Sequence, residues 1–191
     1  MKPLSNQQQA KNLWRDTFAL GSIIEASRHL KNVIDSFESE NLQCYDAFWT
    51  AFMVSYARPF SKNSHIGKIT DRIVPVDCKK THQIILDYRN GIIGHTDPSL
   101  LRKDGHQMHR LRFKITEEGI LPMPNKILPH EELIPKAVKL IDGVYGNLVN
   151  LVTESMHQFH EACELKNGEY IFDFTQREGE RFMSYIKDKG E

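Results

Sequence analysis

The sequence predicts a mainly α-helical protein: an up-and-down bundle of four to five helices with a small β-hairpin insertion. Three observations favour this fold class. Long segments repeat apolar residues at the three- and four-residue spacing of a helix with one buried face. Prolines and glycines separate these segments. One short segment alternates apolar and charged residues with the period of two that is typical of strands. All 191 residues are predicted to form a single domain.

The first two helices are predicted between residues 13 and 58. The first runs from Leu13 to about Glu40 and ends near Asn41. The second runs from Cys44 to Tyr56 and ends before Pro59, because proline cannot supply the next backbone donor. It is apolar on most sides, so it is predicted to be the central helix. Four aromatic residues at helical spacing are predicted to be core and not platforms for stacked bases: Trp14, Phe48, Trp49 and Phe52.

Residues 60–74 are predicted to form a loop with a short turn. A third helix follows Pro75, which is tolerated in a first turn, and it runs through Tyr88 towards Gly91 and Gly94. Each of these glycines weakens a helix by about 1 kcal/mol relative to alanine.

Residues 110–121 alternate Leu111, Phe113 and Ile115 with charged neighbours, and they predict a β-hairpin that turns at Glu118-Gly119. The last long helix is predicted from Pro135 to Cys163. A short C-terminal appendage, about residues 168–191, is predicted to hold one short strand near residues 170–174 and then a charged tail.

The composition excludes several classes of protein. Lys and Arg number 25 and so do Asp and Glu, and this neutral total argues against a protein that coats nucleic acid by bulk charge. The N-terminal sequence lacks the apolar run of a signal peptide, and no apolar stretch approaches the length of a membrane span. Cys44, Cys78 and Cys163 lie far apart, so neither a disulfide framework nor a thiolate zinc site is predicted. We therefore expect a cytoplasmic protein with no membrane partner.

The sequence lacks the common enzyme motifs for phosphate loops, dinucleotides, serine hydrolases and zinc proteases. Two pairs of histidines, His106 with His109 and His157 with His160, have the spacing His-x-x-His. No nearby carboxylate or cysteine completes a recognisable ligand set around either pair. No metal and no other cofactor is therefore predicted.

The segment from residue 87 to residue 97 carries a combination of side chains that suits metal-free cleavage of a phosphodiester. Arg89 is an always-charged fork that matches a phosphate, and His95 exchanges a proton near neutral pH. Asn90 supplies an uncharged donor and acceptor beside them. Together they offer an anion stabiliser, a base and a positioning amide.

Periodicity alone does not bring these side chains together. On a continuous helix, six residues place Arg89 and His95 about 120° apart. Spacing alone favours a simpler interpretation, in which Arg89 forms a surface salt bridge and His95 caps the end of the helix. Either a break of the helix at the glycines or the long reach of Arg89 would bring the two together.

The pattern Arg89-Asn90-x4-His95, at the end of the third helix of a small helical protein, resembles the motif of the HEPN superfamily (higher eukaryotes and prokaryotes nucleotide-binding domain). The resemblance covers about residues 10–165, with the hairpin as an insertion. Gly91 and Gly94 depart from it, because many relatives have helix-favouring residues there.

The resemblance implies a metal-independent endoribonuclease, in which His95 is the general acid and base, Arg89 stabilises the charge on the phosphorane-like transition state and Asn90 orients the site. RNA is the implied substrate, because the attacking group is the ribose 2′-hydroxyl. The resemblance also implies a homodimer with the two motifs facing each other, and a role as a toxin or phage-defence effector, in some members restrained by an antitoxin protein. Other members are non-catalytic modules that dimerise or bind nucleotides or a partner.

Two further residues are candidates for substrate binding. Arg58 either reaches the phosphate or pairs with a carboxylate, and Asp97 either orients His95 or caps the segment after it.

The charge is unevenly spread along the chain. Residues 58–114 hold 12 Lys and Arg against 5 Asp, a net charge of +7, and the remainder carries −7. The motif lies in the basic part, which predicts one basic face for RNA and an acidic remainder that limits non-specific attachment.

Overall fold

The fold is mainly α-helical with small β elements, as predicted. The computed structural model describes residues 5–39, 42–62, 67–90, 112–116, 119–123, 131–163, 165, 168–172 and 183–186. Its four α-helices are α1 (Asn6–Glu38), α2 (Leu42–Ala57), α3 (Lys79–Tyr88) and α4 (Leu133–Cys163). Its strands are β1 (Arg112–Thr116), β2 (Gly119–Met123), β3 (Glu169–Phe172) and β4 (Met183–Ile186). Three short 3₁₀ turns complete this set: η1 (Arg58–Phe60), η2 (Asp71–Ile73) and η3 (Val76–Cys78).

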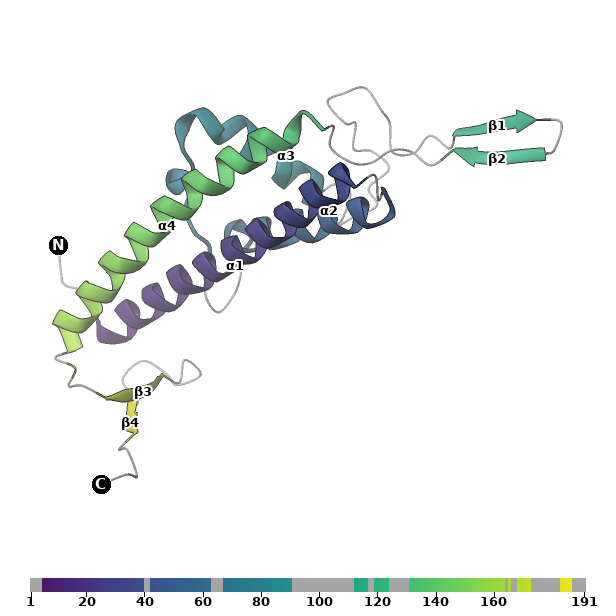
Figure 1. Cartoon of the computed structure of the whole chain (residues 1–191). Coiled ribbons are helices and arrows are strands. Elements are labelled where there is room, and N and C mark those ends of the chain that lie inside the picture. The colour runs from purple at the N-terminus through teal and green to yellow at the C-terminus, as the bar shows by residue number, and fades with distance from the viewer. Residues whose placement is uncertain are drawn as a thin grey trace.

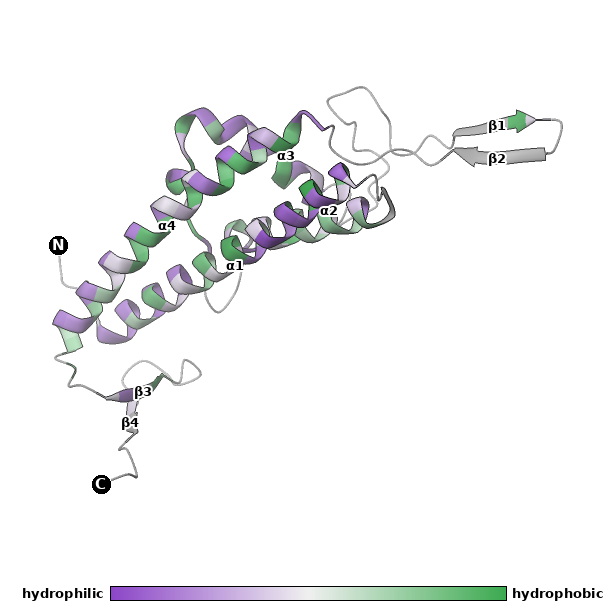
Figure 2. Cartoon of the chain, in the orientation of Figure 1, coloured by the Kyte–Doolittle hydropathy of each residue, from purple (hydrophilic) through white to green (hydrophobic). Residues whose placement is uncertain are grey.

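The central helix is α1, which corrects the prediction that the second helix is central. α1 packs along both α2 and α4, and the three helices lie side by side in Figure 1. Small buried residues on α1, among them Ala19, Ser22 and Ala26, allow both neighbours to approach closely. Figure 2 shows apolar and polar residues alternating along α1 and α4, as expected of helices with one buried face.

The core is built around a row of aromatic rings on α2. Trp49 and Phe52 are fully buried, which confirms the prediction that they are core residues. Their ring centroids are 5.4 Å apart in an edge-to-face arrangement, and Phe52 stacks on Tyr56 at 6.0 Å. Tyr56 in turn contacts Phe60 of η1 at 5.3 Å. This row therefore links the middle of the bundle to the loop that leads into α3.

The two hairpins lie outside the bundle. In the predicted hairpin β1 pairs antiparallel with β2, with Phe113 opposite Pro122 and Ile115 opposite Ile120. It projects away from the helices in Figure 1. β3 pairs antiparallel with β4, a strand that was predicted as charged tail, and the ring of Phe172 lies 5.3 Å from that of Phe159 on α4. None of the described helices is long and apolar enough to cross a membrane.

A close contact joins the segment before α3 to α4. A Cβ atom placed on Gly143 of α4 would lie 2.5 Å from Cγ of Pro75, so the absence of a side chain lets Pro75 sit against the helix. Two residues beyond Pro75, the carboxylate of Asp77 lies 2.6 Å from Nζ of Lys139, also on α4. These contacts fix the start of the segment that ends at Arg89.

We predict that Gly143→Ala lowers the free energy of unfolding by about 1–3 kcal/mol, because the added methyl group overpacks against Pro75. Gly146→Ala is the matched control on the same helix, since a Cβ there meets nothing within 4 Å. The control is expected to raise stability by about 0.5–1 kcal/mol, the helix preference of alanine over glycine. Urea denaturation measures both, and equal effects of the two substitutions would contradict the close contact.

Candidate active site at the end of α3

Arg89 directly follows α3 and is its C-terminal cap residue, and Asn90 comes next. Its backbone is still helical, with φ −60° and ψ −45°, and its N–H is shared between the carbonyls of Ile85 and Leu86. Arg89 is half-buried, and it follows His82 and Ile85 along the buried face of α3 at helical spacing.

Asn90 holds the guanidinium of Arg89. Nη1 of Arg89 donates to Oδ1 of Asn90 at 2.9 Å. Within the described part of the chain, no carboxylate lies within ion-pair distance of Arg89. The predicted surface salt bridge is therefore not formed there, and the positive charge of Arg89 is held in place by a neutral amide. A guanidinium without a carboxylate partner is what the binding of an anionic ligand requires.

The other site candidates divide into two groups. His95 and Asp97, together with Gly91 and Gly94, lie outside the described residues. Arg58 begins η1, and its Nη1 lies 2.8 Å from Oε2 of Glu25 on α1. Of the two roles predicted for Arg58, the structure therefore contains the pairing with a carboxylate.

A buried histidine that the sequence did not single out fixes the start of α3. His82 is 4% exposed, and its Nδ1 lies 2.7 Å from the hydroxyl of Tyr56 on α2. The ring of Phe60 packs edge-on against it at 4.6 Å. Its Nε2 is buried and has no hydrogen-bond partner among the described residues, and a carboxylate oxygen of Asp71 lies 3.9 Å away. Burial lowers the pKa of His82 from its usual 6.5, and the nearby charge of Asp71 opposes this shift only in part.

We predict that His82 makes the stability of the fold depend on pH. The folded pKa lies below the unfolded one, so the unfolded chain binds the proton more readily. The contribution of neutral His82 to the free energy of unfolding is complete above about pH 6.5, and it is lost as the pH falls towards the folded pKa. The free energy of unfolding should therefore decrease with a slope approaching about 1.4 kcal/mol per pH unit from this one group.

His82→Gln is the comparison, because it retains a polar partner for Tyr56 but does not titrate. Urea denaturation between pH 7 and pH 5 should give a shallower pH dependence for this variant than for the wild type. Parallel curves for the two proteins would show that His82 remains as easily protonated in the fold as in the unfolded chain.

His82 was not predicted as a site residue because it belongs to no recognisable sequence motif. The signal that identifies it is the spacing His82, Ile85, Arg89, which places all three on one helix face with an apolar residue between them. The partner Tyr56 lies 26 residues earlier, and only the fold brings the two together.

No group of three or more potential metal ligands occurs among the residues that the structure describes. His157 and His160 are both exposed on α4, and the pair His106 and His109 lies outside the described residues. No family model, curated protein or solved structure matches this chain.

Proposed function

We propose that this protein is a metal-independent endoribonuclease of the HEPN type. The observation that carries the proposal is the state of Arg89: its guanidinium is held by Asn90 and meets no carboxylate in the described part of the chain. Arg58, by contrast, has its guanidinium paired with the carboxylate of Glu25. Arg89 also stands six residues before His95, at the spacing of the family motif.

The proposed reaction needs only side chains of the motif. His95 accepts the proton of a ribose 2′-hydroxyl, and the oxygen forms a bond to the adjacent phosphorus. The bond from phosphorus to the 5′ oxygen breaks, and that oxygen takes a proton from a protonated His95. Arg89 stabilises the additional negative charge on the phosphate oxygens, and Asn90 keeps Arg89 in place. The products are a 2′,3′-cyclic phosphate and a 5′-hydroxyl, and DNA is not a substrate.

A homodimer would bring an arginine and a histidine of the motif to the same phosphate, which one continuous helix does not do. A continuous helix separates Arg89 and His95 by about 120°, so two copies of the motif facing each other would surround one phosphate. We predict a solution mass of twice 22.2 kDa by sedimentation equilibrium. A monomer at micromolar concentration that cuts RNA at full rate would contradict this part of the proposal.

We further propose a cytoplasmic role as a toxin or phage-defence effector, restrained by an antitoxin protein. The alternative is a non-catalytic HEPN-like module that dimerises or binds nucleotides or a partner protein. Gly91 and Gly94 favour that alternative, because they weaken the helix within the motif.

One experiment distinguishes the ribonuclease from the non-catalytic module. The wild type is expressed in a bacterial host, and growth and total RNA are followed over time. The enzyme is expected to slow growth and degrade RNA. An antitoxin in the host would mask this effect in cells, so the purified protein is also incubated with single-stranded RNA in EDTA. If RNA remains intact in both experiments, the enzyme proposal fails and the module is favoured.

A further inference from the structure

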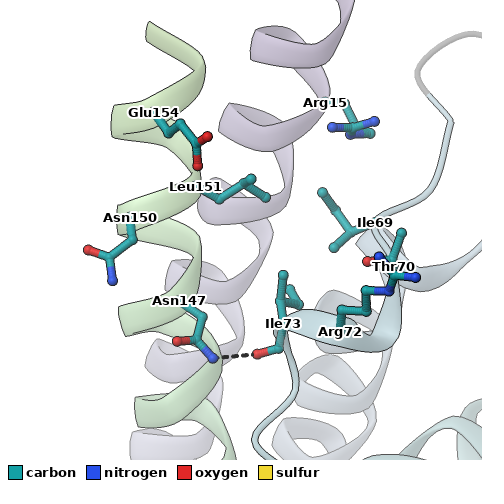
Figure 3. Close-up of a pocket in the computed structure, with 9 residues that line it drawn as sticks. All are labelled: Arg15, Ile69, Thr70, Arg72, Ile73, Asn147, Asn150, Leu151 and Glu154. Carbon is teal, nitrogen blue, oxygen red and sulfur yellow. Dashed lines mark hydrogen bonds between the residues drawn. The ribbon is translucent and has the colours of Figure 1, made fainter. Parts of the chain in front are cut away.

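A pocket distinct from the Arg89 motif opens between α1, α4 and the segment around η2. Its volume is about 450 Å³, within the usual range for sites of small organic molecules. Figure 3 shows Leu151 and Glu154 of α4 on one side, facing Ile69 and η2 on the other, with Arg15 of α1 above them. Ile69 is 2% exposed, so its side chain closes the floor of the pocket.

Hydrogen bonds hold all three walls of this pocket in place. The hydroxyl of Ser155 on α4 donates to Oδ2 of Asp16 on α1 at 2.6 Å, and Asp16 is completely buried. Nδ2 of Asn147 donates to the carbonyl of Ile73 at 2.7 Å, which ties η2 to α4 (Figure 3). A ligand would therefore enter a site that is already formed, which lowers the entropic cost of binding.

The charged residues that line the pocket are Arg15, Arg72 and Glu154, and with the buried Asp16 beside Arg15 their charges sum to zero. Nε and Nη2 of Arg15 both lie 2.8 Å from Oδ1 of Asp16, so the orientation of this guanidinium is fixed and its charge is balanced. Arg72 has no hydrogen-bond or ion-pair partner among the described residues. Glu154 receives one hydrogen bond, from Gln158 to Oε1 at 3.0 Å, and its other oxygen is available.

We propose that this pocket binds a small zwitterion with an apolar centre, of which a peptide of two or three residues is the simplest case. The carboxylate of the ligand pairs with Arg72, and its ammonium group pairs with Glu154. Ile69, Ile73 and Leu151 contact the apolar centre. An extended peptide of two or three residues spans about 7–10 Å, so its charged ends are well separated.

The charge balance distinguishes this ligand from a nucleotide. A phosphate dianion at Arg72 would face the negative charge of Glu154 across the pocket, and the charge of Arg15 is already balanced by Asp16. A ligand of zero net charge with separated ends satisfies both walls. This inference does not rest on the proposed ribonuclease activity.

Titration of the full-length protein with leucyl-leucine, followed by NMR or calorimetry, tests the proposal. Two derivatives serve as matched probes: the N-acetylated peptide lacks the ammonium group, and the C-terminal amide lacks the carboxylate. Each is expected to bind about tenfold more weakly than the free peptide. Glu154→Gln should weaken binding of the free peptide by the same factor and leave binding of the acetylated peptide unchanged. Arg72→Gln should also weaken binding of the free peptide by this factor, and it should leave binding of the C-terminal amide unchanged.

Arg28→Gln on α1 and Glu161→Gln on α4 are the controls, because both residues are exposed and neither lines the pocket. They are expected to leave binding unchanged. The proposal is overturned if the free peptide does not bind at about 10 mM, if both derivatives bind as well as it does, or if adenosine or guanosine monophosphate binds more tightly.

Discussion

Arg89→Ala and His95→Ala are each expected to lower the rate of RNA cleavage by at least about 100-fold. Loss of a positioned proton-transfer group costs about 10² to 10⁴ in rate, and loss of one group that stabilises the developing charge costs about 10² to 10³. Arg89→Lys retains the positive charge but loses the planar fork, so its activity should fall between the wild type and Arg89→Ala. Initial rates on one RNA oligonucleotide in EDTA measure all three variants.

Arg28→Ala is the matched control for these variants, since Arg28 is an exposed arginine of α1. It should cleave RNA at the wild-type rate. Thermal denaturation shows whether each variant is folded. Among the described residues the side chain of Arg89 bonds only to Asn90, so its loss should cost little stability. Full activity in folded Arg89→Ala would remove Arg89 from the proposed site.

Phe52→Ala is expected to lower the free energy of unfolding by about 3–5 kcal/mol. Phe52 is completely buried between the rings of Trp49 and Tyr56, so truncation leaves a cavity in the middle of the aromatic row. Small domains are stable by only about 5–15 kcal/mol, so this one change removes a large part of the total. Urea denaturation at 25 °C measures the loss.

Phe52→Leu separates the cavity from the loss of the ring. It retains most of the apolar volume and should cost less than about 1.5 kcal/mol. Met156→Ala, at a side chain that is 56% exposed on α4, should change stability by no more than about 0.5 kcal/mol. If Phe52→Ala is as mild as Met156→Ala, the aromatic row does not form the core.

Much of the helical fold could be predicted because its long helices bury one face. The predicted end of the last helix, Cys163, is also the end of α4, and α2 ends at Ala57, just before Pro59. The start of the first helix was placed at Leu13, whereas α1 begins at Asn6. Its first turns are polar and carry no apolar pattern, and the capping hydrogen bond from Gln8 N–H to the Ser5 hydroxyl starts the helix there.

The interior arrangement could not be predicted from apolar content. α2 is the most apolar helix, yet α1 is central, because small residues rather than large ones allow a helix to pack against two neighbours. β4 was missed because four residues in a charged tail give too short a pattern, and its pairing partner lies across ten intervening residues.

The candidate site could be predicted in its residue types but not in its geometry. The sequence identifies Arg89 and Asn90, and the fold adds the hydrogen bond that joins them. The contact of His82 with Tyr56 and the bond of Ser155 to Asp16 join residues that are 26 and 139 positions apart. Such contacts depend on helix packing, which local periodicity does not encode.

The central claim is that a motif containing Arg89 and His95 cleaves RNA without a metal. The most direct measurement is mass spectrometry of the ends produced from one RNA oligonucleotide by the purified wild type in EDTA. The expected ends are a 2′,3′-cyclic phosphate and a 5′-hydroxyl, and a single 2′-deoxy substitution at the cut should protect that position. A 3′-hydroxyl with a 5′-phosphate, or cleavage that appears only after a divalent metal is added, would contradict the claim.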